Sequence, residues 1–179
     1  MRLVQNLGQV KDGNGCTMNF YEVPSGKLSN QWTQHGENTR CPRKPLLFLN
    51  KPPYRFALAQ ATVVGEDAIF LWDTWTGEQV RRIRVAPYSL ATRPSVSANG
   101  RYVVAGTWND PQDNPISAGF TIWNVDSGEV VYRTPTYKST WGPNTVGEEV
   151  YPSFSQDGKY LVTVSQEGVR IYEIAAELK

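Results

Sequence analysis

The chain has 179 residues, of which 40% are hydrophobic, 20% charged and 12% aromatic. This is the composition of a folded globular protein that can bury a core, and it excludes disordered and collagen-like chains. Because 18 Lys and Arg residues face 17 Asp and Glu residues, the net charge of +1 creates no overall field that would draw the protein to nucleic acid or to an anionic membrane.

The sequence also bears on the cellular compartment. No apolar run approaches the roughly 20 residues that span a bilayer. The residues after Met1 turn polar too soon for a signal peptide, and two cysteines, Cys16 and Cys41, without an Asn-X-Ser/Thr sequon agree with a reducing compartment. We therefore expect a cytoplasmic protein without membrane contact, with the nucleus as the alternative compartment.

One short pattern recurs along the chain: an apolar residue, an aromatic residue, a polar residue, three variable residues and a glycine. It covers residues 20–26, 71–77 and 122–128, and a fourth copy at 171–173 lacks the glycine. The aromatic residues are 51, 51 and 49 residues apart, at Tyr21, Trp72, Trp123 and Tyr172. A spacing that returns three times predicts structural repeats of about fifty residues.

A basic residue followed by a short, β-rich apolar run precedes each copy. These basic residues are Arg2, Arg55, Arg101 and Lys159. The runs have the length and composition of strands rather than of buried helices. Before the last two runs, Asn99-Gly100 and Asp157-Gly158 accept a positive φ and so predict tight turns between antiparallel strands. Each repeat thus predicts four strands, named a to d in chain order, with the aromatic residue on strand c.

Four-stranded antiparallel meanders repeated at this period are typical of β-propeller blades. The repeats resemble the WD-repeat β-propeller family: Trp72-Asp73 matches the family's Trp-Asp dipeptide after the apolar residues 69–71, and residues 153–161 are also similar to family members. The resemblance implies an all-β fold and a role in protein–protein contacts.

The resemblance is degenerate, because the Gly-His pair that follows strand d in the family is missing. Gln34 stands before His35, and Ala86 and Tyr137 occupy the corresponding later positions. We therefore expect the family's buried Asp-His-Ser/Thr-Trp hydrogen-bond network to be incomplete in every blade. If His35 takes the family position, the resemblance implies a hydrogen-bonded packing residue.

The predicted blades span residues 1–36, 37–87, 88–137 and 138–179 of one partial propeller domain. The first blade lacks strand a and the last lacks strand d, which gives about three and a half to four blades, where propellers usually have about 4–8. Three alternatives follow: the chain is part of a larger propeller, it closes as an irregular four-bladed ring, or its open blade edges associate with another chain.

Two long irregular segments, residues 108–120 and 134–150, fall on the same side of the predicted propeller, where the b–c and d–a connections emerge. Adjacent long loops on a rigid scaffold often carry binding residues, and aromatic side chains anchor interfaces. The alternative is that these aromatic rings fold back onto their own loops or a neighbouring blade. The predicted partner-binding residues are Trp108, Asp110, Asp113, Tyr137, Lys138 and Trp141.

The sequence offers little material for catalysis. His35 is the one histidine, Cys16 and Cys41 lack CxxC spacing, and neither a Gly-X-Ser-X-Gly elbow nor a Walker A segment is present. Asp110, Asp113 and Asn114 suit a hard cation weakly, and a Pro/Asp/Asn turn explains them better. We expect no catalytic residue, no cofactor and no metal.

These observations predict a non-catalytic protein–protein interaction scaffold. Arg81, Arg82 and Arg84 suggest a basic groove for single-stranded nucleic acid, but they fit better an outer strand that is kept from edge pairing, so a protein partner is favoured. The alternative is a fragment of a propeller enzyme, a hydrolase or a quinoprotein-like dehydrogenase, whose active site lies partly in missing blades.

Overall fold

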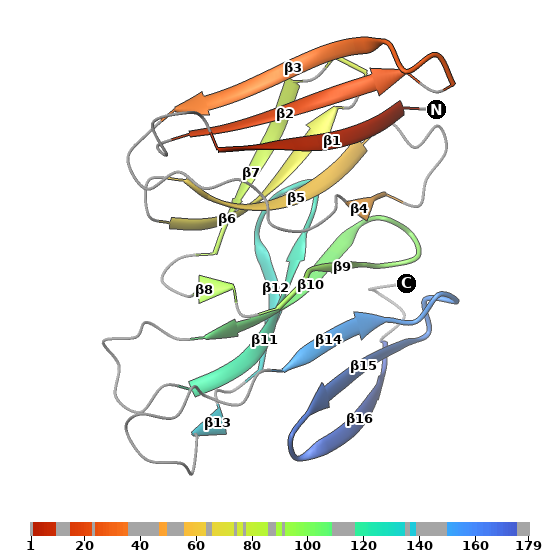
Figure 1. Ribbon diagram of the computed structural model, residues 1–179. Helices are drawn as coiled ribbons and strands as arrows, with labels where there is room; N and C mark the ends of the chain where they lie inside the picture. The colour runs from red at the N-terminus through yellow and green to blue at the C-terminus, as the bar shows by residue number, and fades with distance from the viewer. Residues whose placement is uncertain are drawn as a thin grey trace. The chain divides into compact units, whose positions relative to one another are not determined.

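The computed structural model describes residues 2–9, 15–22, 24–35, 47–49, 56–63, 66–73, 75–76, 78–85, 89–90, 92–108, 117–134, 137–138 and 150–174. Every regular element in this part of the chain is a β-strand, and the strands form four antiparallel sheets, which we name A to D (Figure 1). The chain divides into two compact units, Met1–Arg84 and Val85–Lys179, with two sheets in each. The predicted all-β fold is confirmed.

The first unit holds sheets A and B, and in both sheets each strand pairs with its neighbour in the chain. Sheet A has the order β1 (Arg2–Gln9), β2 (Gly15–Glu22), β3 (Leu28–His35). Sheet B has the order β4 (Leu47–Phe48), β5 (Phe56–Val63), β6 (Glu66–Asp73), β7 (Glu78–Arg84). Sheet A therefore has the predicted strands b to d, and sheet B has strands a to d.

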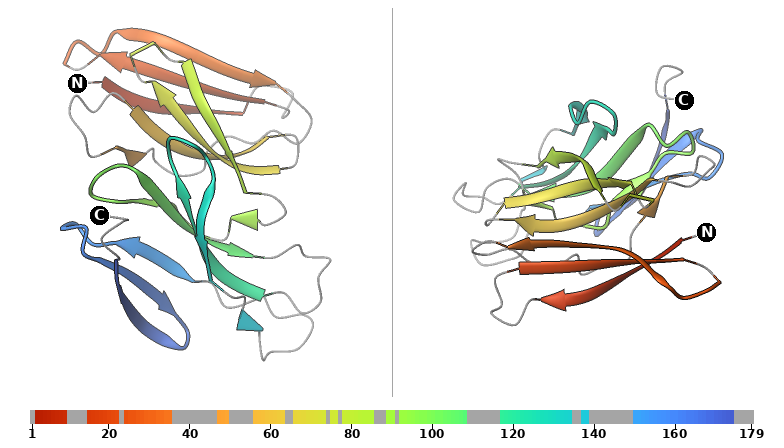
Figure 2. Two further views of the ribbon diagram at one scale, coloured as in Figure 1. Left: turned by 180° about the vertical axis from the view of Figure 1, so that it is seen from behind. Right: turned by 90° about the horizontal axis from the view of Figure 1, so that it is seen from above.

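The second unit holds sheets C and D, shown from behind in green to cyan and in blue in Figure 2. Sheet C is built on β10 (Tyr102–Trp108) and β11 (Ser117–Asn124). Its strand a is split into β8 (Ser89–Leu90) and β9 (Ser95–Val96), and its strand d is split into β12 (Val130–Arg133) and β13 (Tyr137–Lys138). Sheet D has the order β14 (Tyr151–Phe154), β15 (Tyr160–Ser165), β16 (Gly168–Glu173).

The repeated aromatic residue occupies the same register position in all four sheets, directly opposite an apolar residue of strand b. The pairs are Tyr21 with Leu3, Trp72 with Ala57, Trp123 with Val103, and Tyr172 with Leu161. Because side chains alternate between the two faces of a sheet, we call the face that carries these pairs the aromatic face and the opposite one the reverse face. The register also shows that Arg2, one residue before Leu3, is not equivalent to Arg55, which stands two residues before Ala57.

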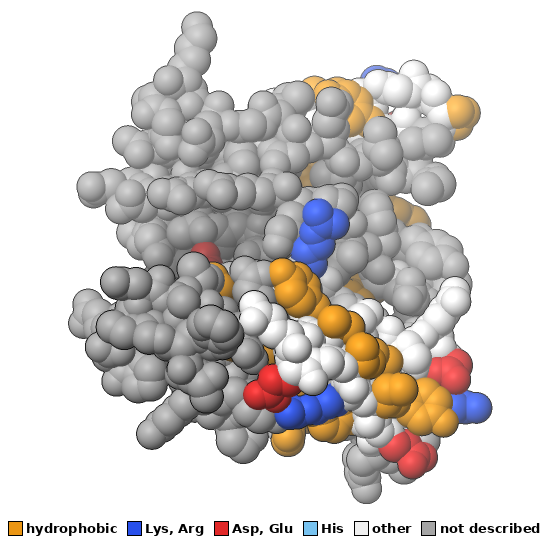
Figure 3. All heavy atoms as spheres, turned by 60° about the horizontal axis from the view of Figure 1, so that its bottom comes forward, with side chains coloured by type: hydrophobic (Ala, Val, Ile, Leu, Met, Phe, Trp, Pro, Cys, Tyr) orange, Lys and Arg blue, Asp and Glu red, His pale blue; other side chains and the backbone are white. Residues whose placement is uncertain are grey.

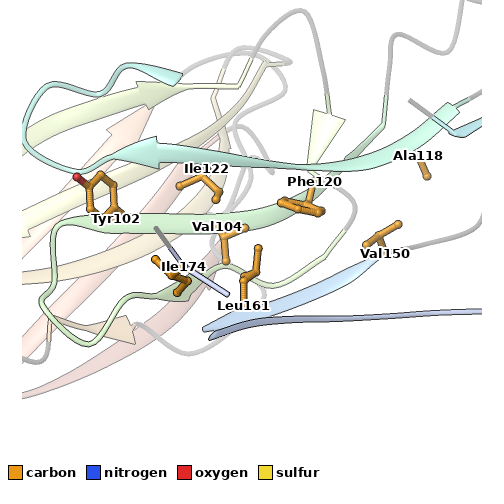
Figure 4. Packing of buried hydrophobic residues seen from close by; sticks show 8 residues of the cluster. All are labelled: Tyr102, Val104, Ala118, Phe120, Ile122, Val150, Leu161 and Ile174. Atoms are coloured by element: carbon orange, nitrogen blue, oxygen red, sulfur yellow. The ribbon is translucent and has the colours of Figure 1, made fainter. Parts of the chain in front are cut away.

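In each unit, the aromatic face of the later sheet packs against the reverse face of the earlier one. The ring centroid of Trp72 lies 4.4 Å from that of Trp32 and 6.4 Å from that of Phe20, both in sheet A. In the second unit, Tyr172 of sheet D lies 5.9 Å from Phe120 of sheet C. The buried cluster between sheets C and D, drawn in Figure 4, comprises Tyr102, Val104, Ala118, Phe120, Ile122, Val150, Leu161 and Ile174.

The two predicted Gly-containing turns are confirmed. Gly100 and Gly158 have φ of 70° and 72°, a region that side chains other than glycine rarely enter. The backbone N–H of Tyr102 donates to Ser97 Oγ at 3.0 Å, and the Ser97 hydroxyl donates to Asn99 Oδ1 at 2.7 Å. The Ser155 hydroxyl makes the equivalent bonds in sheet D, so the same three side-chain positions close both a–b turns.

The polar residue after the repeated aromatic residue closes the turn between strands c and d. Asp73 Oδ1 accepts hydrogen bonds from the backbone N–H groups of Trp75 and Thr76, at 2.9 and 3.4 Å. Asn124 Oδ1 accepts the equivalent bonds from Asp126 and Ser127, at 2.8 and 3.0 Å. A side chain that accepts bonds from the backbone two and three residues later fixes a turn, which explains the polar residue at this point of the repeat.

The a–b turn of sheet D predicts how the stability of the protein changes at acidic pH. The Ser155 hydroxyl and the Lys159 backbone N–H donate to Asp157 and hold the pKa of this carboxyl below its ordinary value. The carboxylate therefore contributes stability above the pKa of an unfolded aspartate, about 3.9, and this contribution is lost as the pH falls through the lower pKa of the folded chain. We expect urea midpoints to fall more steeply below pH 4 in the natural chain than in Asp157→Asn, whose amide matches Asn99 in the equivalent turn. Equal slopes in the two proteins would contradict this assignment.

Trp72 and Trp123 are fully buried, and neither indole N–H has a hydrogen-bond partner among the described residues. Their partners on strand b, Ala57 and Val103, offer no side-chain acceptor. This agrees with the expectation that the Asp-His-Ser/Thr-Trp network is incomplete in these two blades. The Trp72 ring packs against Trp32 and Phe20 of sheet A.

Candidate protein-binding surface

Three of the predicted partner-binding residues meet at one end of sheet C. Trp108, the last residue of β10, pairs with Ala118 on β11, and Ala118 pairs with Tyr137 on β13. Lys138 pairs with Ser117 in the next position. Trp108 and Tyr137 thus share one row of the sheet, separated by a single residue with a small side chain.

The remaining predicted residues, Asp110, Asp113 and Trp141, lie outside the described residues, as do the side chains of Tyr137 and Lys138. We call the row of Trp108, Tyr137 and Lys138 at the end of sheet C the sheet C rim. Its residues belong to the segments 108–120 and 134–150 that we expected to be irregular, but Trp108, residues 117–120 and residues 137–138 are parts of strands β10, β11 and β13.

The side chain of Trp108 is partly packed in the core and partly exposed. Its side chain is partly buried and packs against the cluster between sheets C and D. Its indole Nε1 is buried and has no hydrogen-bond partner in the described part of the chain. One part of the ring therefore belongs to the core, as the packing alternative expects, and the rest remains accessible at the sheet C rim.

Two threonines tie the short outer strands to the centre of sheet C near this end. The backbone N–H of Gly106 donates to Thr92 Oγ1 at 2.8 Å, and that of Phe120 donates to Thr134 Oγ1 at 2.9 Å. Gly106 and Gly119 make room for them, since a Cβ at either position would lie 2.6 or 2.5 Å from a threonine hydroxyl. The split strands a and d are thereby held beside β10 and β11, and Thr134 fixes the chain just before β13.

Other residues that the sequence singled out have structural surroundings. Arg81, Arg82 and Arg84 lie on β7, the outer strand of sheet B, and the guanidinium carbon of Arg82 stands 6.0 Å from the ring centroid of Phe70. His35 ends β3 opposite Gly15, and its side chain is outside the described part. The basic cluster thus lies on the outer strand where the edge-protection interpretation expects it.

The described residues contain no group of three His, Cys, Asp or Glu side chains placed to hold a metal ion. The described part of the chain also contains no helix with the length and apolar character that a membrane crossing requires.

Sequence reasoning missed one surface, the reverse face of sheet D. Figure 3, in which the bottom of Figure 1 is turned toward the viewer, shows a band of hydrophobic side chains on the side where sheet D lies. The exposed members are Tyr151, Tyr160, Val164, Val169 and Ile171. The signal was present in the run Tyr160-Leu161-Val162-Thr163-Val164, which carries large apolar residues on both faces of its strand rather than on alternate positions.

No protein-family model matches the chain, and no curated protein matches it in sequence. Its structure is similar to a chain of Kuenenia stuttgartiensis hydrazine synthase, with a TM-score of 0.62 and 14% identity over 92% of this chain and 51% of that chain. It is also similar to a chain of a mitotic checkpoint complex, with a TM-score of 0.55 and 15% identity over 96% of this chain and 50% of that chain. The protein spans about half the length of these two chains. Both are propellers, and at such identities the likeness establishes the fold alone: sheets A to D are antiparallel blades of the β-propeller type.

Proposed function

We propose that this protein is a non-catalytic scaffold with degenerate WD-like blades, and that it binds another protein through the sheet C rim. The observation that carries the proposal is the register that places Trp108 and Tyr137 in one row, with Lys138 beside it. Trp and Tyr anchor interfaces because they bury a large area with few rotatable bonds, and a lysine at the edge adds attraction for an acidic partner segment.

The WD-like part of the proposal draws support from the c–d turn. Asp73 is the acidic half of the Trp72-Asp73 dipeptide. It accepts hydrogen bonds from the backbone N–H groups of Trp75 and Thr76 in the turn that follows. Asn124 repeats this role in sheet C. The aspartate of the dipeptide therefore stabilises the c–d turn in this chain, in addition to matching the family in sequence.

The similar structures include a propeller in a solved mitotic checkpoint complex and one in hydrazine synthase. A propeller fold serves both assembly and catalysis, so the choice between them must come from the site. The sheet C rim offers aromatic area and a positive charge, which are means of recognition rather than of bond cleavage. This favours the scaffold over the propeller-enzyme alternative.

A photo-crosslinking experiment tests the proposal. Benzoylphenylalanine replaces Tyr137 in one protein and the exposed Val131 of β12 in a control, and both are irradiated in an extract of the source cells. We expect a discrete crosslinked protein from position 137 that excess natural chain competes away, and none from position 131. With that protein purified, Tyr137→Ala should weaken binding about tenfold or more, and Val131→Ala should leave it unchanged. The same products from both positions, or none from position 137, would contradict the proposal.

A further inference from the structure

The packing between neighbouring sheets follows one rule in both units. In the first unit, the aromatic face of sheet B, with Trp72, lies on the reverse face of sheet A, with Trp32 at 4.4 Å between ring centroids. In the second unit, the aromatic face of sheet D, with Tyr172, lies on the reverse face of sheet C, with Phe120 at 5.9 Å. A reverse face is therefore covered by the aromatic face of a following sheet.

Two neighbouring positions on the reverse face of sheet D carry the same residues as their equivalents in sheet C but have a different environment. The strand pairing matches Val162 and Ile171 in sheet D to Val104 and Ile122 in sheet C. Ile122 is 5% exposed, whereas Ile171 is 67% exposed. A β-branched residue that is buried at one point of the repeat thus stands open to solvent at the equivalent point of the next.

The exposed area extends over all three strands of sheet D. Tyr151, Val164 and Val169 form one continuous row across β14, β15 and β16, and Ser153, Val162 and Ile171 form the next. Contiguous apolar surface of this kind is uncommon on monomeric proteins and usually marks an interaction site. Because the side chains stand on a paired sheet, their positions are fixed by the backbone ladder, so the face is preorganised for a flat, apolar partner.

The rule also identifies what should cover this face: an aromatic face of the same repeat. Sheet A presents one, on which Tyr21 is partly exposed and its cross-strand partner Leu28 is 46% exposed. Beside them, Asn19 Nδ2 donates to the Tyr21 hydroxyl at 3.0 Å, and Gln31 Nε2 donates to Asn19 Oδ1 at 2.9 Å. These two bonds satisfy part of the hydrogen-bonding capacity of Asn19, Gln31 and Tyr21 before a partner sheet covers the Tyr21 ring.

We propose that the reverse face of sheet D binds a second copy of this chain, and that sheet A of that copy covers it with Tyr21 and Leu28. The contact is head to tail, because the two surfaces that meet are different. Such contacts build closed rings or longer chains of subunits, depending on the rotation between copies. The surface shares no residue with the sheet C rim, so this proposal stands or falls independently of the proposed function.

Light scattering of the purified protein at several concentrations gives the first test. We expect a mass of at least twice the 20.1 kDa of one chain. Ile171→Glu should reduce this mass to that of the monomer, because a charge would be buried at the centre of the contact. Val131→Glu is the matched control, since Val131 is 43% exposed on β12 of the same unit and should leave the mass unchanged. Circular dichroism of each variant checks that its sheets are intact.

Mixing two variants tests the head-to-tail geometry. Tyr21→Glu should also yield monomers, and Leu28→Glu replaces it if Tyr21→Glu fails to fold. The Ile171→Glu protein keeps an intact sheet A face, and the sheet A variant keeps an intact sheet D face. A mixture of the two should therefore form a dimer with one chain of each. A two-fold contact between two sheet D faces would give no recovery and would overturn the proposal.

Other outcomes also overturn it. The first is a natural chain that remains monomeric up to about 100 µM, a concentration at which a specific interface of standard size is normally formed. The second is an effect of Val131→Glu on the mass equal to that of Ile171→Glu. The third is aggregation whose size is changed neither by the sheet D variant nor by the sheet A variant.

Discussion

Replacement of Trp72 by alanine is expected to lower the free energy of unfolding by about 3–5 kcal/mol, the usual cost of removing a large aromatic side chain from a core. Trp72 is fully buried, and its ring lies against Trp32 and Phe20 of sheet A and 6.1 Å from Phe70 of its own sheet. Its indole N–H has no partner among the described residues, so the loss is one of packing rather than of hydrogen bonding. The cavity left by the ring would lie between sheets A and B. The two sheets cannot close it without breaking hydrogen bonds between their own strands.

Trp75→Ala is the matched control, three residues along the same chain. Trp75 is 50% exposed in the c–d turn, so we expect its replacement to change stability by less than about 0.5 kcal/mol. Urea unfolding followed by circular dichroism gives the overall loss, and hydrogen exchange read by mass spectrometry shows whether peptides of sheets A and B lose protection first. Similar losses for the two replacements would contradict the assignment of Trp72 to the core between sheets A and B.

Gly106→Ala is expected to destabilise the second unit by about 3 kcal/mol, at the upper end of overpacking effects. A Cβ at this position would collide with the backbone carbonyl oxygen of Val150 and lie 2.6 Å from Thr92 Oγ1. This oxygen is a backbone atom directly before β14 of sheet D, so relief of the collision requires a shift of the backbone. Any shift of β10 would also stretch the hydrogen bond from the Gly106 N–H to Thr92 Oγ1, now 2.8 Å.

Gly119→Ala is the comparison for this experiment. The nearest atom to a Cβ there is Thr134 Oγ1 at 2.5 Å, the end of a side chain, and the nearest backbone atom is 3.7 Å away. We therefore expect a smaller loss than for Gly106→Ala when both are measured by urea midpoints under the same conditions. A larger loss for Gly119→Ala would contradict the assignment of the cost at position 106 to a collision with the Val150 carbonyl oxygen.

The repeat made the strand order predictable. The spacing of Tyr21, Trp72, Trp123 and Tyr172 placed one aromatic residue on strand c of each sheet, and the pairing places all four opposite strand b at equivalent positions. The Asn-Gly and Asp-Gly turns were predictable for the same reason, because a positive φ at Gly100 and Gly158 depends on two or three neighbouring residues. A basic residue before a strand is a weak marker of register, since Arg2 stands one residue before the strand b residue opposite the aromatic residue, whereas Arg101 and Lys159 stand two residues before it.

The breaks in the outer strands of sheet C were not predictable. β8 and β9 share one neighbour, as do β12 and β13, and at the breaks Thr92 and Thr134 bond to the neighbouring strand through their side-chain oxygens as well as their backbone N–H groups. Each bond joins residues 14 positions apart and needs a glycine in the facing strand. Neither threonine nor glycine signals this by itself, since both are common in unbroken strands and in turns.

For the candidate site, the sequence singled out three residues that lie at one end of sheet C, but it did not give their arrangement. The long segments near Trp108 and Tyr137 were the reason for choosing these residues, and only the pairing of both with Ala118 put the two in one row. The partial burial of Trp108 against the sheet C and sheet D cluster likewise depends on residues from 102 to 174.

The sequence by itself determined the fold class, the position of each aromatic strand and the a–b turns, because alternation, β-branching and a positive φ act over a few adjacent residues. Only the tertiary structure decided which faces are covered. Ile122 and Ile171 occupy the same place in their repeats, but sheet D packs over Ile122 and no described residue packs closely enough over Ile171 to bury it. Burial depends on which sheet follows in space, and no local pattern of residues contains that information.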